Sequence, residues 1–163
     1  MKGGIKMKKI VLALICVCLF ALSSPVLAMD NAVYDTQKIP HKVFSPAALN
    51  SANNTSLQVL SAPYWEVLSV WYIDDVGTST SDSWTSSSKT TRYVIDHIYA
   101  KTKVYNRGVI DVTKADDQLN ASHAGASARC TSISHIFSDH EVYGAHTFEE
   151  AGFQSWYPET YDT

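Results

Sequence analysis

Residues 92–106 read RYVIDHIYAKTKVYN and carry the clearest β-strand pattern of the chain. Successive side chains of a strand point to opposite faces, so this stretch presents two different surfaces. One surface holds Tyr93, Ile95, His97, Tyr99, Lys101, Lys103 and Tyr105, and the other holds Val94, Asp96, Ile98, Ala100, Thr102 and Val104. The second set is small or apolar from Ile98 onward, which predicts that it packs in the core.

A hairpin is predicted directly after this strand. Asn106-Arg107-Gly108 precedes the β-branched run Val109-Ile110-Asp111-Val112. Glycine adopts the left-handed backbone that tight hairpin turns require, so the second run is expected to fold back on the first.

Further strands are expected on both sides of the hairpin. Residues 57–74 have apolar residues on both faces, which predicts a central strand with Trp71 in the core. Residues 119–128 place three alanines on one side, which predicts a strand where two layers approach closely; an alanine-rich helix is the alternative. In residues 77–91, 11 of 15 are Ser or Thr, which is typical of a hydroxyl-rich edge strand, a mobile loop, or both.

The last third of the chain completes the pattern. Residues 133–137, 141–148 and 153–161 read as strands, with a turn at residues 149–152 and with Pro158 marking an edge strand. Several short strands without a convincing amphipathic helix predict an all-β protein, either an antiparallel β-sandwich or a barrel-like sheet.

The N-terminus has the features of a secretory signal peptide. Four lysines precede an apolar run at residues 10–22, and the sequence SSPVLA ends at Ala28. The run is shorter than the roughly 20 residues that span a bilayer, so we expect cleavage after Ala28 and secretion without a membrane span. Residues 29–56 contain many turn-forming residues and predict a flexible arm or linker, and residues 57–163 predict a single β-sandwich domain.

Loss of the signal peptide changes the charge and the cysteine count. It contains 4 of the 13 basic residues and none of the 16 acidic ones, so residues 29–163 carry a net charge of −7. Nucleic acids need clustered Lys and Arg, so they are not expected as partners. Two of the three cysteines also lie in the signal, so Cys130 has no intramolecular partner. It is expected to be a buried inert thiol, with a disulfide between chains as the alternative.

Aromatic side chains are the candidate binding residues. The set consists of Trp84, Tyr93, Tyr99, Tyr105, Trp156 and Tyr157. Aromatic residues contribute interface energy at low entropy cost, and Trp84 stands alone in a polar run. We therefore expect a non-enzymatic extracellular protein that acts by surface contact with wall polymer, peptide or protein.

A histidine cluster is the candidate metal site. His123, His135, His140 and His146 lie within 24 residues, near Cys130, Asp139 and Glu141. Such side chains bind zinc or copper, and His140 and His146 share one face of a strand. A divalent-metal protein that uses His135, His140 and His146 is therefore the alternative hypothesis, although no standard ligand spacing is present and the main hypothesis needs no cofactor.

Enzyme motifs are absent from the sequence. The five glycines after Ala28 are isolated, so there is no glycine-rich phosphate loop, and no Gly-x-Ser-x-Gly occurs. The carboxylate pairs at Asp74-Asp75, Asp116-Asp117 and Glu149-Glu150 are adjacent in sequence, so on a strand their side chains point to opposite faces. The sequence therefore favours a protein that is not an enzyme.

Three stretches resemble small exported proteins of Gram-positive bacteria that have no assigned activity. They are residues 98–105 (IYAKTKVY), the alanine and serine alternation of residues 121–128, and residues 143–148 (YGAHTF), and the likeness covers about the C-terminal 70 residues. The chain is also similar to bacteriocins of the lactococcin 972 type, which are small, cysteine-poor, exported β-sandwiches rich in Ser, Tyr and His. This second resemblance implies a toxin or inhibitor as a further alternative, and neither resemblance assigns a functional residue.

Overall fold

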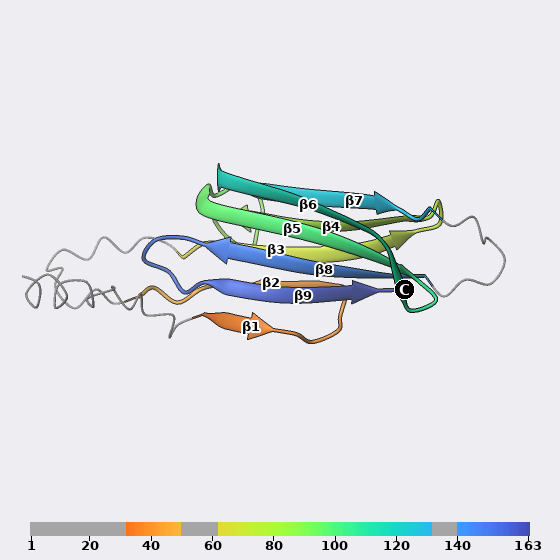
Figure 1. Cartoon of the computed structure of the whole chain (residues 1–163). Helices are drawn as coiled ribbons and strands as arrows, with labels where there is room; N and C mark the ends of the chain where they lie inside the picture. The colour runs from red at the N-terminus through yellow and green to blue at the C-terminus, as the bar shows by residue number, and fades with distance from the viewer. Residues whose placement is uncertain (1–31, 50–61, 132–139) are drawn as a thin grey trace, which may run out of the picture. The chain divides into compact units, whose positions relative to one another are not determined.

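The computed structural model describes residues 32–49, 62–131 and 140–163, which form two β-sheets packed face to face (Figure 1). The five-stranded sheet has the order β1-β9-β8-β5-β6, and the four-stranded sheet has the order β2-β3-β4-β7. The strands are β1 (Val33–Asp35), β2 (His41–Phe44), β3 (Tyr64–Tyr72), β4 (Val76–Trp84), β5 (Ile95–Asn106), β6 (Val109–Ala121), β7 (His123–Arg129), β8 (His140–Glu149) and β9 (Trp156–Asp162). The predicted all-β class is confirmed, and the two sheets form a sandwich rather than a closed barrel.

The β5–β6 hairpin follows the sequence expectation. Arg107 and Gly108 connect the strands with φ values of 52° and 75°, the left-handed conformations that match the twist of a hairpin. On β5, Ile98, Ala100, Thr102 and Val104 are all fully buried, so the predicted core face is correct. Strand β6 continues through the polar residues 113–118, because the backbone N–H and C=O groups along this edge of β5 need hydrogen-bond partners.

The hydroxyl-rich stretch is placed differently from the expectation. Its first half forms β4, which lies between β3 and β7 and is therefore an interior strand rather than an edge strand. Ser79, Ser81 and Ser83 of β4 are fully buried between the sheets. Small hydroxyl side chains fit there because the sheets approach closely, and the hydroxyls of Ser79 and Ser81 find hydrogen-bond partners.

The alanine-rich segment forms strand β7, as predicted in preference to a helix. Ala124, Ala126 and Ala128 are buried, and the hydroxyl of Thr102 on β5 donates a 2.6 Å hydrogen bond to the carbonyl oxygen of Ala126. This bond joins the two sheets directly, which requires a small side chain on β7.

Residues 32–49 belong to the sheets, although the sequence predicts a flexible arm over residues 29–56. Strand β1 pairs in parallel with β9, and β2 pairs with β3. The buried ammonium of Lys42 on β2 lies 2.8 Å from the carboxylate of Asp35 on β1, which links the sheets on this side. Burial raises the pKa of Asp35, but the hydrogen bond from Lys42 outweighs burial and holds this pKa below its usual value. Residues 1–31, with the predicted signal peptide, and residues 50–61 lie outside the described residues.

Two predictions need correction, an edge strand at Pro158 and a core position for Trp71. Pro158 was expected on an edge strand, but β9 lies between β1 and β8, and its pairing with β8 is interrupted opposite Pro158 because proline has no N–H to donate. Trp71 is only partly buried and stacks on His140 with ring centroids 4.8 Å apart, so it closes one end of the interior. The predicted strand at residues 133–137 lies outside the described residues.

One half of the interior is aromatic. Trp65 and Phe148 stack with ring centroids 5.2 Å apart, and Trp156 lies 5.3 Å from Phe148 and 5.2 Å from Phe44. The same cluster contains the smaller apolar residues Val67, Ile95, Ile98, Ala100 and Ala124. Burial of large apolar area is the main stabilising contribution of this half.

The other half of the interior is polar and is centred on His146 of β8, which is 3% exposed. Its Nδ1 lies 2.9 Å from the hydroxyl oxygen of Ser81, and its Nε2 lies 2.8 Å from that of Thr160. Thr160 also contacts the hydroxyl of Ser69 at 2.5 Å, and Ser69 contacts Ser79 at 2.8 Å. We call these five residues the His146 network. Burial lowers the pKa of His146 to about 3, so its imidazole is neutral.

Gly144 lies at the centre of this network, and its replacement by alanine should destabilise the protein. A Cβ at this position would overlap Thr160 Oγ1 and Ser69 Oγ, both fixed by hydrogen bonds. We expect Gly144→Ala to lower the free energy of unfolding by about 1–3 kcal/mol in urea denaturation.

Gly125→Ala is the matched control for that measurement. Its added Cβ would meet the side chain of His123, which is half exposed and can move. Gly125→Ala should therefore cost much less than Gly144→Ala, and equal losses from the two variants would contradict the packing described for Gly144.

Candidate functional site

Tyrosine side chains lie on the outer surface of the five-stranded sheet, whose strands can be followed in Figure 1. We call this set the tyrosine face. Its members lie on β1, β5, β8 and β9: Tyr34, Tyr99, Tyr105, Tyr143, Tyr157 and Tyr161. Val104 and Val142, which alternate with these residues on β5 and β8, are fully buried, so the tyrosines point away from the core. Tyr34 is 65% exposed and the other five are partly buried.

Three of these tyrosines form a continuous cluster of rings. The ring centroids of Tyr105 and Tyr143 are 4.9 Å apart, and those of Tyr143 and Tyr161 are 4.7 Å apart. Lys38, in the connection from β1 to β2, places its Nζ 5.6 Å from the Tyr143 centroid and 5.8 Å from the Tyr161 centroid. The cluster is thus a preformed aromatic surface in contact with a cation.

A histidine links two carboxylates at the other end of the tyrosine face. His97 Nδ1 lies 2.9 Å from Glu149 and its Nε2 lies 2.8 Å from Asp117. Burial lowers the pKa of His97, but the two carboxylates outweigh burial and raise it above its ordinary value.

Glu149 connects this histidine to the tyrosines. It accepts a 2.6 Å hydrogen bond from the hydroxyl of Tyr157, whose ring stacks on Tyr34 with centroids 5.0 Å apart. Burial and this carboxylate raise the pKa of Tyr157 to about 12, so its hydroxyl stays protonated.

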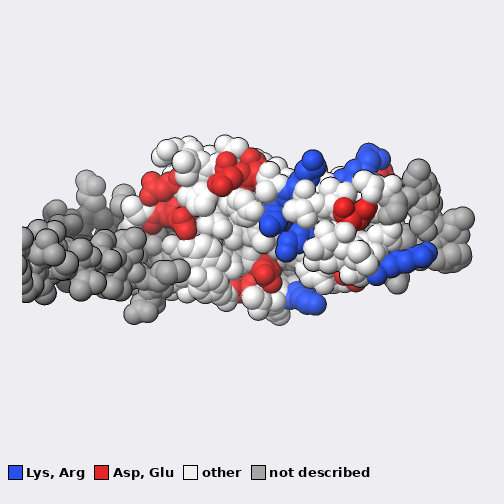
Figure 2. Space-filling view, in the orientation of Figure 1, with Lys and Arg blue, Asp and Glu red and all other residues white. Residues whose placement is uncertain are grey.

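Charged side chains share this surface with the tyrosines. Figure 2 shows acidic groups mainly at the left of this surface and basic groups right of its centre, where further acidic groups lie beside them. Lys101 and Lys103 lie on the same side of β5 as Tyr99 and Tyr105, and Glu159 lies between Tyr157 and Tyr161 on β9. A ligand on this surface would meet rings and hydroxyls flanked by both signs of charge.

The predicted aromatic residues are divided by the structure. Tyr99, Tyr105 and Tyr157 come together on the tyrosine face. Trp156 is 2% exposed in the core, so it offers no surface for a partner. Tyr93 packs against the core, with its hydroxyl 3.5 Å from Glu150.

Trp84 lies at the end of β4, in the other sheet, and Arg92 stacks over its ring at 3.8 Å. It packs back on its own domain and is separate from the tyrosine face.

Four residues of this surface, Tyr34, Tyr143, Tyr161 and Lys38, are not among the candidates predicted from the sequence. The signal for two of them was present, because Tyr143 alternates with buried residues on β8 and Tyr161 is four residues from Tyr157 on β9. Their contact depends on the register that pairs Tyr143 with Tyr161, which no local pattern specifies.

The histidine cluster is dispersed among the described residues. His146 is buried with both ring nitrogens hydrogen-bonded, and His123 is exposed and lies 2.8 Å from Asp82. His140 and His146 share a face of β8 but are six residues apart, about 20 Å along a strand. Within residues 32–49, 62–131 and 140–163, no group of three or more His, Cys, Asp or Glu could hold a metal ion. His135 and Asp139 lie outside the described residues.

Two arrangements on or under the four-stranded sheet resemble catalytic pairs. Ser81 and His146 form a hydroxyl–imidazole pair, but both are buried in the interior. Glu66 and Asp82 face each other across β3 and β4. Burial raises the pKa of Glu66, but hydrogen bonds from Lys89 and His41 outweigh it and lower the pKa, so Glu66 cannot serve as a general acid at neutral pH.

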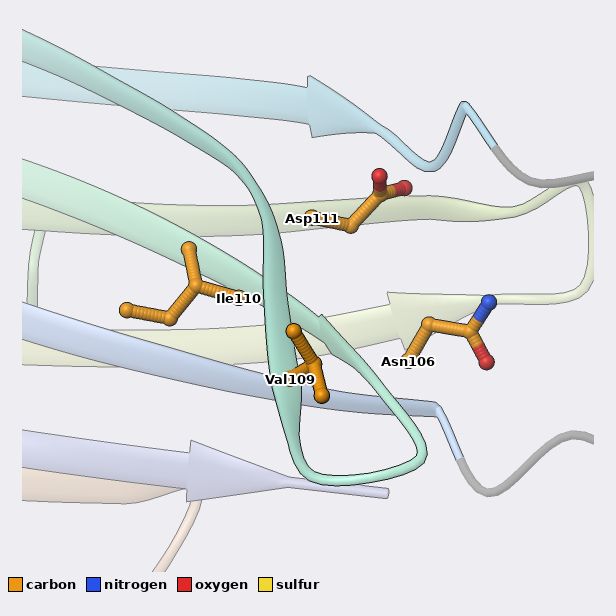
Figure 3. Close-up of a pocket in the computed structure, with 4 residues that line it drawn as sticks. All are labelled: Asn106, Val109, Ile110 and Asp111. Carbon is orange, nitrogen blue, oxygen red and sulfur yellow. The ribbon is translucent and has the colours of Figure 1, made fainter.

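A depression of about 190 Å³ lies at the β5–β6 hairpin, lined by Asn106, Val109, Ile110 and Asp111 (Figure 3). Its four side chains point in different directions rather than toward one centre, and its volume is below that of typical ligand pockets. Cys130 lies nearby, is only partly buried, and donates a 2.8 Å hydrogen bond to Asp111. The thiol is therefore less buried than predicted.

No family model, curated protein or solved structure matches this chain. Across residues 32–49, 62–131 and 140–163, the structure contains no helix with the length and hydropathy to cross a membrane.

Replacing Asp117 should lower the pKa of His97. Asp117→Asn removes one of the two carboxylates that favour the imidazolium, so NMR titration should show the His97 pKa falling toward its ordinary value. In the unchanged protein, the ion pairs of protonated His97 with Asp117 and Glu149 should stabilise the fold below pH 6.5. This stabilisation should disappear as the pH rises through the raised pKa of folded His97.

The same variant should lose less than about 1 kcal/mol of stability at pH 6, because Asp117 is largely exposed. An unchanged His97 titration in Asp117→Asn would contradict the described network.

Proposed function

We propose that this chain is an exported, non-enzymatic binding protein that contacts a cell-wall polysaccharide through the tyrosine face. The observation that carries the proposal is the row of partly exposed rings on one sheet, held by contacts among themselves. Aromatic rings bury apolar sugar faces, and tyrosine hydroxyls and flanking charged groups hydrogen-bond sugar hydroxyls. Secretion follows from the signal peptide expected at residues 1–28.

An extended polymer suits this surface better than a compact ligand. The tyrosines extend over four strands of the sheet, from β5 to β1, rather than converging on a pocket. Their rings are rigid and already packed, so little conformational entropy is lost when a chain is laid across them. The net charge of −7 for residues 29–163 disfavours strongly anionic polymers and is compatible with neutral or zwitterionic ones.

A peptide added at a sheet edge has less support. On edge strand β6, the side chain of Asp116 accepts a hydrogen bond from the backbone N–H of Gly125 on β7. Asp111 similarly accepts from the N–H of Thr131, and the β5–β6 pairing is irregular at Val104 and Tyr105. Charged side chains and bulges protect edges against added strands.

Sedimentation of the purified protein with insoluble wall polysaccharide tests the proposal. The double variant Tyr99→Ser/Tyr157→Ser removes two rings of the tyrosine face and should weaken binding by about tenfold or more. Tyr72→Ser is the matched control, because Tyr72 is 49% exposed on the other sheet. Tyr72→Ser should bind as the unchanged protein does.

Protease treatment of the wall material identifies the kind of partner. Binding that survives the treatment and is inhibited by soluble glycan fragments is the expected result. Binding that disappears after protease treatment would show a protein partner. Equal binding by Tyr99→Ser/Tyr157→Ser and by Tyr72→Ser would contradict the tyrosine face as the binding surface. A melting temperature for each variant separates lost binding from lost folding.

A further inference from the structure

The most specific feature of the tyrosine face is the contact between Lys38 and the ring cluster. The ammonium lies within 6 Å of two ring centroids, at 5.6 Å for Tyr143 and 5.8 Å for Tyr161, and 3.5 Å from the Tyr143 hydroxyl. Positions within about 6 Å of a ring centroid are those at which a cation is attracted by the ring quadrupole. The structure thus contains a cation held by two tyrosines.

A carboxylate completes this environment. Glu141 pairs with Tyr105 across β5 and β8, and it forms a hydrogen bond with the side chain of Tyr161. A cation at the position of the Lys38 ammonium therefore lies near two rings, Tyr143 and Tyr161. Tyr105 packs against Tyr143, and the Glu141 carboxylate is bonded to Tyr161. Lys103 pairs with Tyr143 across β5 and β8, and Tyr161 pairs with Tyr143 across β8 and β9, so these two residues flank Tyr143 on opposite sides.

We propose that Tyr143 and Tyr161, with Tyr105 and Glu141 packed beside them, form a cage for a quaternary ammonium group carried by the polysaccharide, and that Lys38 occupies this cage in the free protein. The inference deepens the proposed function and rests on it for the identity of the polymer. Quaternary ammonium groups are recognised by aromatic cages because they are weakly hydrated and lose little solvation when rings surround them.

Lys38 is held weakly enough to be displaced. Its side chain is exposed, and within residues 32–49, 62–131 and 140–163 it makes no ion pair with a carboxylate. A primary ammonium is strongly hydrated, and ordering the flexible lysine side chain costs conformational entropy. A quaternary ammonium can therefore replace it at the rings, so Lys38 competes with the ligand.

Tetramethylammonium is the probe for the cage, added to the purified protein at constant ionic strength with sodium as the balancing cation. We expect NMR shift changes confined to the rings of Tyr105, Tyr143 and Tyr161. Lys38→Ala should strengthen tetramethylammonium binding by about 2–5-fold, and Tyr161→Leu should weaken it by at least that factor. Tyr72→Leu, on the other sheet, is the matched control and should leave tetramethylammonium binding unchanged.

Choline and its neutral isostere 3,3-dimethylbutan-1-ol distinguish cation recognition from apolar contact. Choline should shift the same three rings and the isostere should not. Equal effects of the two compounds, or a Lys38→Ala variant that binds tetramethylammonium no better than the unchanged protein, would overturn the cage.

A competition experiment separates this inference from the proposed function. Tetramethylammonium should release the protein from wall polysaccharide that carries quaternary ammonium groups. If tetramethylammonium does not release the protein from the polysaccharide, this result contradicts the cage as the recognition site. It leaves the tyrosine face as the glycan-binding surface. Tetramethylammonium binding to a protein that binds no polysaccharide supports the cage and contradicts the proposed polymer.

Discussion

The His146 network is the interaction on which the rest of the structure depends. The hydroxyl of Ser81 donates to the carbonyl of Tyr99, so its oxygen must accept the proton of His146 Nδ1. Nε2 of the neutral ring then accepts from Thr160, and the hydroxyls of Ser69 and Ser79 continue the chain. Each hydroxyl donates once along this path, so one direction of hydrogen bonding satisfies every member. Because Ser69, Ser79 and Ser81 come from one sheet and Thr160 and His146 from the other, the network fixes the two sheets against each other.

This interior determines what the outer surface can present. Alternation along β8 and β9 places the network and the aromatic core on one side and the tyrosines on the other. Tyr143 and Tyr161 are brought into contact because Gly144 and Thr160, their neighbours in sequence, pair at the centre of the network. The ring cluster is therefore held by the same register that the interior specifies. A preformed array of this kind binds with a smaller loss of conformational entropy than a mobile one.

The sequence predicted the elements that local chemistry controls. The two faces of β5, the Arg107-Gly108 turn and the alanine side of β7 all follow from periodicity and backbone preference, and the structure confirms them. Elements controlled by long-range pairing were not predicted. The serine-rich sequence of β4 is also typical of a loop, and its burial depends on hydrogen bonds of Ser79 and Ser81 to distant strands. The contact of Lys42 with Asp35 likewise requires that the two sheets have formed. The tyrosine face was found in part, because Tyr99, Tyr105 and Tyr157 lie on recognisable strands, whereas the contact of Lys38 with Tyr143 spans 105 residues of chain.

The protonation state of His146 in the folded protein tests this account most directly. Nitrogen-15 NMR of the imidazole between pH 7 and pH 4 should show a neutral ring throughout, with the proton on Nδ1, since its pKa lies at about 3. The hydrogen-bond path requires this tautomer, which is the less common one for a free histidine. A ring that titrates near pH 6.5, or one that carries its proton on Nε2, would contradict the network and the register that it imposes on the tyrosine face.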